Sequence, residues 1–212
     1  LFNYDKYSTR HSPVLYGILS FFYSLEISDK FIRLIFLHIG ILLPFIFYKC
    51  LKLKFPSVNE DKIVLFSSLI LLSPSFWSLT IWPDSRIFGL ILFCLSIFYF
   101  LKFNEDQNFN NLIKCILFYS AASYLSPNFA IFSIFYFYHF YKKFKFSKEI
   151  LFIIILNFIL SIPAFLYLFS LDNIFLIKSA VPSNAIQTSD FFNVSNKILI
   201  ISSIIFFYSI PF

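Results

Sequence analysis

The chain has 212 residues, of which 59% are hydrophobic and only 13% carry a charged side chain, with a mean hydropathy of +0.80. A soluble domain has about 25% charged residues, so a water-soluble fold could not cover this much apolar surface, whereas lipid accepts apolar side chains on the outside of a bundle. We attribute the net charge of +6 to basic cytoplasmic loops rather than to nucleic-acid binding. The composition predicts an all-α fold, a polytopic transmembrane helix bundle.

Eight apolar runs predict the elements of this bundle, because a helix crosses the hydrocarbon of a bilayer with about 20 residues. In chain order the runs are 13–25, 31–49, 63–82, 87–103, 112–125, 129–141, 150–169 and 198–212. The runs 112–125 and 129–141 are short, and the turn Ser126-Pro127-Asn128 predicts two short helices there. The first run either spans the membrane or lies in its interface, so we expect about seven or eight membrane segments.

The chain begins with Leu1, contains no methionine and ends inside an apolar run, so we expect a piece of a longer protein that is truncated at both ends. The whole of 1–212 is predicted to be a single transmembrane domain fragment. Its parts are an outer-face juxtamembrane segment at 1–30, a helix bundle at 31–169, an outer loop at 170–197 and the start of a further span at 198–212.

Lysine content alternates from one connection to the next. The connections 49–62, 102–114 and 142–148 are rich in lysine, while 83–86, 126–128 and the long segment 170–197 are poor. Because cytoplasmic loops carry an excess of Lys and Arg, the lysine-rich connections are predicted to face the cytoplasm. The lysine-poor connections, Asp84 included, then face outward.

Two clusters of charged residues are candidate sites on that outer side. The segment 4–13 holds Asp5, Arg10 and His11, and its bases could bind a lipid phosphate; an ordinary polar flank explains it equally simply. The turn 82–86 holds Asp84 and Arg86. Asp84 could bind a metal ion or position an acceptor, with Arg86 on a phosphate, or it could simply cap the next helix.

A third candidate lies between the two short helices. In Tyr124-Leu125-Ser126-Pro127-Asn128, the Asn128 side chain could line a site, although a helix-breaking turn explains the same residues. The segment 170–197 is polar and long enough to be functional, or it is a loop that only covers the bundle. No glycine-rich phosphate loop fits, since the chain has three glycines.

The order of these features resembles the polytopic C-type glycosyltransferases that use polyprenyl-phosphate sugars, a superfamily that includes protein mannosyltransferases and the aminoarabinose transferases of lipid A. The resemblance covers about residues 4–141. It is carried by His11-Ser12-Pro13-Val14-Leu15-Tyr16, where the family often has His-Pro-Pro-Leu-Tyr, by Arg33 near the start of the next helix, and by Ser73-Pro74 followed by Asp84. Where many members have Lys-Pro or Lys-Tyr after a later short helix, this chain has Pro127-Asn128.

The resemblance implies a membrane glycosyltransferase that moves a sugar from a polyprenyl-phosphate donor to a lipid, glycan or protein acceptor. The expected catalytic residues are Asp5 and Asp84, which would activate the acceptor hydroxyl as a general base or through a divalent metal, Mg²⁺ or Mn²⁺. The expected substrate-binding residues are Arg10, His11, Arg86 and Asn128. The expected location is a bacterial inner membrane, with the site facing the periplasm or the exterior.

Two other classes of protein fit the same apolar pattern. A transporter, flippase or polysaccharide polymerase would place ionisable groups near the membrane midplane and use broken helices there. A structural membrane subunit would need no chemistry of its own. Polar residues that converge at one outer surface indicate a transferase, whereas polar residues along a central path indicate a transporter.

Overall fold

The computed structural model describes residues 13–170, with side chains described through residue 166, and this part of the chain consists of helices and short connections, with no strand. Its elements in order are α1 (Pro13–Ser24), α2 (Asp29–Lys54), α3 (Glu60–Ser68), η2 (Leu69–Leu72), α4 (Pro74–Ile81), α5 (Ser85–Asp106), α6 (Phe109–Leu125), η3 (Pro127–Phe132), α7 (Ser133–Phe144) and α8 (Lys148–Ser170). The chain divides into two compact units, Leu1–Leu160 and Ser161–Phe212. All packing discussed below belongs to the first unit, and the described part of the second is the last ten residues of α8.

Three helices of the described chain are long and apolar enough to cross a membrane: α2, α5 and Lys148–Leu166 of α8. At about 1.5 Å per residue, the 26 residues of α2 extend about 39 Å, more than the roughly 30 Å of hydrocarbon in a bilayer. The bent pair 60–81 makes a fourth if it is counted as one span. The chain is therefore an all-helical protein with the helices of an integral membrane protein, and the expected seven or eight segments are not confirmed within these residues.

The predicted run 63–82 is not one straight helix. Its two halves, Glu60–Leu72 and Pro74–Ile81, meet at 64°. Pro74 occupies the first turn of α4, where its missing N–H costs nothing, and the Ser73 hydroxyl accepts a hydrogen bond from the Phe76 amide at 3.4 Å. The Trp77 indole N–H donates to the Leu71 carbonyl at 2.6 Å, so a side chain serves one of the carbonyls at the break. We call this break the elbow.

The other connections are short and capped by side chains. Asn59, Asp84 and Asn108 each precede a helix and accept a hydrogen bond from the amide two residues later, at 2.8, 2.8 and 2.9 Å. Gln107 ends α5 in the left-handed conformation with φ 56°, so the chain reverses directly into α6. These caps satisfy backbone amides at the starts of α3, α5 and α6.

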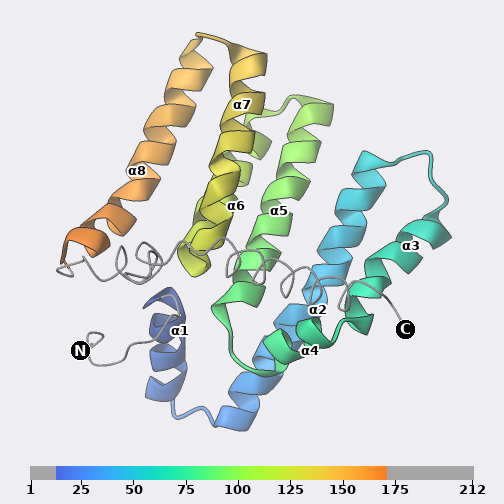
Figure 1. The fold of residues 1–212 in the computed structure, drawn as a ribbon, viewed down its shortest axis with the longest axis vertical. Helices are drawn as coiled ribbons and strands as arrows, with labels where there is room; N and C mark the ends of the chain where they lie inside the picture. Colours follow the sequence, from blue (N-terminus) through green and yellow to red (C-terminus); the bar gives the residue numbers. More distant parts are fainter. Residues whose placement is uncertain (1–12, 171–212) are drawn as a thin grey trace, which may run out of the picture. The chain divides into compact units, whose positions relative to one another are not determined.

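Helix α5 lies at the centre of the first unit, between α2 on one side and α6 and α7 on the other (Figure 1). Three clusters of buried side chains hold these helices together. One joins α5, α6, α7 and α8; a second joins α2, α4 and α5; a third joins α1 and α2, with Phe36 in edge contact with Phe88 of α5 at 4.5 Å between ring centroids. Many large apolar side chains outside these clusters are exposed, as expected of a surface that faces lipid.

Two glycines allow close approach of helices. At Gly40 in α2 an added Cβ would lie 2.2 Å from Thr80 Cγ2 of α4, and at Gly89 in α5 it would lie 3.1 Å from both Ser126 Cβ and Phe129 Cε2. Small residues at such contacts are typical of helix packing in membranes. The first contact holds α4 on α2, and the second holds the turn at 126 against the start of α5.

The connections of the first unit form two ends (Figure 1). The lysine-rich end holds the connections 55–59, 107–108 and 145–147, and the lysine-poor end holds 25–28, 82–84 and 126. Ten of the thirteen Lys and Arg residues of the described chain lie within two turns of the lysine-rich end. Five of the eight Asp and Glu residues of the described chain lie there as well. The two ends therefore carry net charges of +5 and zero, which follows the alternation in the sequence.

Candidate functional site

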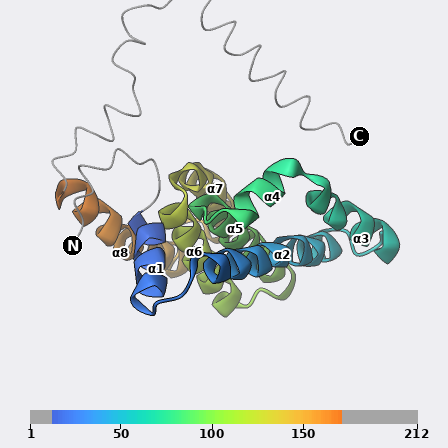
Figure 2. The same ribbon diagram turned by 90° about the horizontal axis from the view of Figure 1, so that it is seen from below.

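The lysine-poor end brings together polar residues from connections that are distant in the sequence. Seen from below, α1, the start of α2, α4 and the start of α5 lie at this end (Figure 2). The α1–α2 connection contributes Tyr23 and Asp29, and the α4–α5 connection contributes Trp82 and Asp84. These two connections form the candidate site.

A hollow of about 240 Å³ lies between them. We call it the Arg33 hollow; its lining residues are Leu19, Tyr23, Asp29, Ile32, Arg33, Trp82 and Pro83. The Arg33 guanidinium carbon lies 4.0 Å from the centroid of the Trp82 ring, which is a cation–π contact. The Tyr23 hydroxyl donates to Asp29 Oδ1 at 2.9 Å, and this hydrogen bond to a carboxylate raises the pKa of the tyrosine above its ordinary value.

Local structure explains why these side chains meet. Helix α1 ends in a tight reversal in which Glu26 has φ 56° and its amide donates to the Tyr23 carbonyl at 3.0 Å. Helix α2 then begins at Asp29, and Arg33 follows four residues later on the same helical face. The close contact between Gly40 and Thr80 positions the end of α4, and with it Trp82, over that face.

Asp84 and Arg86 form an ion pair at the start of α5. Asp84 is 7% exposed, whereas the Arg86 side chain is 63% exposed. Asp84 Oδ1 accepts from the Arg86 amide at 2.8 Å and from Arg86 Nε at 3.0 Å, and Oδ2 accepts from Nη2 at 2.6 Å. The carboxylate therefore caps α5, which is the structural role that the sequence also allowed, while its cation faces outward.

The Asn128 side chain is exposed and lies in η3, directly after the end of α6. The preceding Ser126 packs against Gly89, four residues after Ser85 begins α5. The turn with Asn128 therefore belongs to the same end of the bundle as Asp84 and Arg86. The remaining predicted site residues, Asp5, Arg10 and His11, lie outside the described residues.

Potential metal ligands are scattered over the described residues. Between residues 13 and 170, no three His, Cys, Asp or Glu side chains gather as potential ligands. Of the two carboxylates predicted to hold a divalent ion, Asp84 has both oxygens bonded to Arg86, which competes with a metal for the same lone pairs.

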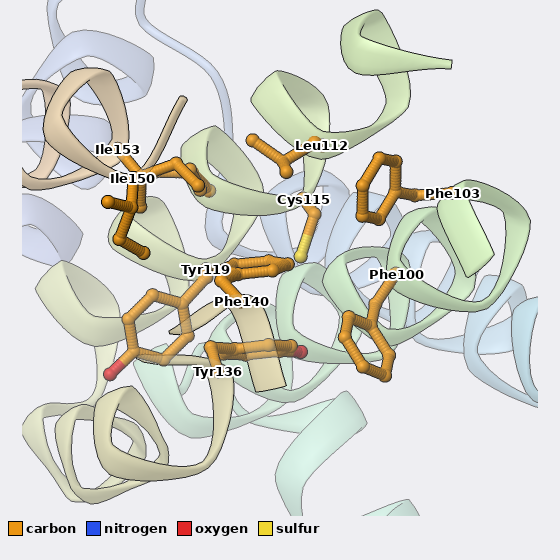
Figure 3. Packing of buried hydrophobic residues seen from close by; sticks show 10 residues of the cluster. Phe100, Phe103, Leu112, Cys115, Tyr119, Tyr136, Phe140, Ile150 and Ile153 are labelled. Atoms are coloured by element: carbon orange, nitrogen blue, oxygen red, sulfur yellow. The ribbon is translucent and has the colours of Figure 1, made fainter. Parts of the chain in front are cut away.

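The interior of the bundle is held by aromatic rings and hydroxyls (Figure 3). Ser96 of α5 and Tyr136 of α7 share a hydrogen bond of 2.7 Å, and Tyr136 packs against Tyr119 with 5.1 Å between ring centroids. The Tyr119 hydroxyl donates to the Ala130 carbonyl at 2.7 Å. These contacts satisfy polar groups inside an apolar core, and none of them involves a charged side chain.

No family model, curated protein or solved structure matches the chain.

Sequence reasoning did not identify the Arg33 hollow as a site. The sequence prediction uses Arg33 only as part of the family resemblance and assigns no role in a site to Tyr23, Asp29 or Trp82. The spacing of Asp29 and Arg33 is a usable signal, because residues four apart on a helix share a face. No sequence pattern predicts that Trp82 approaches Arg33, since this contact depends on the elbow and on the packing of two different helices.

Proposed function

We propose that the chain is part of a membrane glycosyltransferase that moves a sugar from a polyprenyl-phosphate donor to a lipid, glycan or protein acceptor. In this proposal the reaction takes place at the lysine-poor end, which faces the periplasm or exterior of a bacterial inner membrane. The observation that carries the proposal is that the Asp84–Arg86 ion pair and the Asn128 turn lie together at the end of the bundle whose net charge is zero.

The proposal includes a membrane topology. The helices α2, α5 and α8 cross the bilayer, and the bent pair α3–α4, the short α6 and the combined η3–α7 are each counted as one further segment. With the apolar run 198–212 this makes about seven segments, and α1 would be an eighth if it spans. A helix as short as α6 can be one of these membrane segments because it packs against the longer α5.

The chemistry follows from the charges at the start of α5. The acceptor hydroxyl attacks the anomeric carbon of the donor, the bond from that carbon to the phosphate oxygen breaks, and the polyprenyl phosphate leaves with the electron pair. Asp84 takes the hydroxyl proton as general base, alone or together with Asp5. Arg86, whose side chain is largely exposed, moves from the carboxylate to the departing phosphate, assisted by Arg10 and His11. Asn128 contacts the substrate from the neighbouring turn.

The transporter alternative has less support. Such a protein needs ionisable groups along a central path. In the described part of the chain the acids and the lysines and arginines lie at the two ends. Of the two histidines there, His38 is exposed on α2 with Nδ1 2.7 Å from the Leu34 carbonyl, and His139 is exposed on α7. Pro44 lies within a continuous helix and has no acid beside it.

The experiment that tests the proposal measures sugar transfer by the full-length protein in proteoliposomes, using a panel of polyprenyl-phosphate sugars. Asp84→Asn is the informative variant, because asparagine is an equally good helix cap but is no base. We expect the transfer rate to fall by about 100-fold or more, the usual contribution of a general base, with helix content unchanged.

Asp106→Asn is the matched control. Asp106 also accepts a hydrogen bond from the amide two residues later, at 2.9 Å, but it lies at the lysine-rich end. Its variant should transfer sugar at the parent rate. If Asp84→Asn and Asp5→Asn both leave transfer unchanged, the assigned roles are wrong.

A further inference from the structure

The Arg33 hollow has a charge pattern that the proposed transfer reaction does not use. It is lined by one carboxylate, Asp29, and one guanidinium, Arg33, which face the same space. In the described chain Arg33 has no carboxylate within ion-pair distance, and the one hydrogen bond to the Asp29 side chain comes from Tyr23 to Oδ1. Both charged groups keep capacity for a ligand, and the hollow is neutral as a whole.

The aromatic residues indicate the depth of the hollow in the membrane. Tyr23 is 54% exposed and its hydroxyl is hydrogen-bonded to Asp29. Trp82 is 57% exposed and its ring lies against the Arg33 guanidinium. Exposed Tyr and Trp rings beside charged groups at helix ends are typical of the lipid headgroup region. Large exposed apolar side chains such as Phe31 and Ile81 lie on the adjoining turns of α2 and α4, so the hollow borders a lipid-facing surface.

We propose that the Arg33 hollow binds the headgroup of a zwitterionic phospholipid whose phosphate is joined to a primary amine. The Arg33 guanidinium holds the phosphate oxygens, since planar guanidinium groups bind phosphate through two parallel hydrogen bonds. The ammonium group donates to Asp29 and lies against the Tyr23 ring, where a cation is favoured. The acyl chains remain in the bilayer beside α1 and α2.

Charge complementarity selects this occupant over others. An anionic headgroup would satisfy Arg33 but supply no cation for Asp29, and a trimethylated amine has no N–H to donate to the carboxylate. A primary amine on a phosphate satisfies both residues at once. The volume of about 240 Å³ is smaller than a typical drug-sized site, which suits a headgroup rather than a whole lipid.

The test measures which lipids stay bound to the full-length protein. The protein is reconstituted in nanodiscs that hold equal amounts of phosphatidylethanolamine, phosphatidylcholine and phosphatidylglycerol. It is then extracted gently, and native mass spectrometry identifies the lipids that remain bound to it. We expect phosphatidylethanolamine to be retained about tenfold over each of the other two, the size of one charge-assisted hydrogen bond.

Two variants separate the two charges. Asp29→Asn should abolish the preference for phosphatidylethanolamine over phosphatidylcholine, and Arg33→Gln should reduce retention of all three lipids. The matched controls are Glu26→Gln and Lys30→Gln, which remove exposed charges of the same connection that do not line the hollow. Both controls should retain lipid as the parent does, with unchanged helix content in all four variants.

Each contrary outcome overturns the proposal in a recognisable way. Equal retention of phosphatidylethanolamine and phosphatidylcholine means that the hollow does not recognise the amine. Preferred retention of phosphatidylglycerol, lost with Arg33→Gln alone, means that it takes an anionic phosphate. Because lipid retention is measured without any sugar donor, the result does not depend on whether the chain transfers sugar.

Discussion

Replacing Gly40 by alanine should destabilise the protein strongly, because the added methyl group has no room. Its Cβ would lie 2.2 Å from Thr80 Cγ2 and 3.0 Å from Thr80 Cβ. Thr80 is fully buried and cannot rotate away freely, since its hydroxyl donates to the Phe76 and Trp77 carbonyls at 3.0 and 3.1 Å. Either α4 moves away from α2 or the threonine loses these bonds.

The magnitude follows from two opposing effects. Overpacking of a well-packed interior costs typically 1–3 kcal/mol, and a contact this short belongs at the upper end. Alanine in place of glycine in a helix recovers about 1 kcal/mol of backbone entropy. We therefore expect Gly40→Ala to lower the free energy of unfolding by about 2 kcal/mol. The other two glycines of the chain also lie in helices, so the same substitution at those positions can be compared with Gly40→Ala.

Gly17 is the matched control, since an added Cβ there meets nothing within 4 Å. Gly17→Ala should leave stability unchanged or raise it by up to about 1 kcal/mol. Gly89→Ala should fall between the two, because its contacts at 3.1 Å include the edge of the Phe129 ring, which can shift. The assay is reversible unfolding in mixed micelles, followed by far-ultraviolet circular dichroism.

A second substitution tests whether the clash with Thr80 causes the loss of stability. Thr80→Ser removes the offending methyl group but keeps both hydroxyl hydrogen bonds. In the Gly40→Ala background it should restore about 1–2 kcal/mol, which is the coupling expected of residues in direct contact. If Gly40→Ala is as harmless as Gly17→Ala, or if Thr80→Ser gives no rescue, α4 does not pack on α2 as described.

Two further predictions concern the interior and the orientation of the bundle. Tyr136→Phe removes the hydroxyl that shares a 2.7 Å hydrogen bond with Ser96, and should lower stability by about 1 kcal/mol in the same unfolding assay, while the Ser96→Ala, Tyr136→Phe pair should cost less than the two changes added together. In a cysteine-free background, Ser28→Cys should react with a membrane-impermeant maleimide added to intact cells, whereas Ser57→Cys should react only after permeabilisation. Equal labelling of the two positions from outside, or the reverse order, would contradict the proposed orientation.

Most helix positions could be predicted from hydropathy because each is bounded by strong local signals. The predicted end of a helix at 125 matches α6, since Ser126-Pro127 cannot continue it. The run 13–25, which left spanning and interfacial placement open, is a helix of 12 residues in the structure. The elbow is not predicted although Ser73 and Pro74 are a good helix start, because the mainly apolar stretch 63–82 has the length of a single span.

The candidate site was less predictable. A capping role for Asp84 follows from its position before an apolar run, and the structure shows the cap together with the Arg86 pair. That Arg33 lies over Trp82 depends on contacts between α2 and α4, which no local pattern encodes. Hydropathy says which residues enter the membrane but not which ends of different helices meet.

The elbow has a consequence for where the chain can bend. A broken helix normally exposes backbone carbonyls that need water, which confines breaks to the membrane surface or to wet cavities. Here the Trp77 indole takes the place of water at the Leu71 carbonyl, and the Ser73 amide donates to the Ile70 carbonyl at 3.1 Å. A corner that supplies its own donors can turn within hydrocarbon, so α4 need not emerge from the lipid before the chain changes direction.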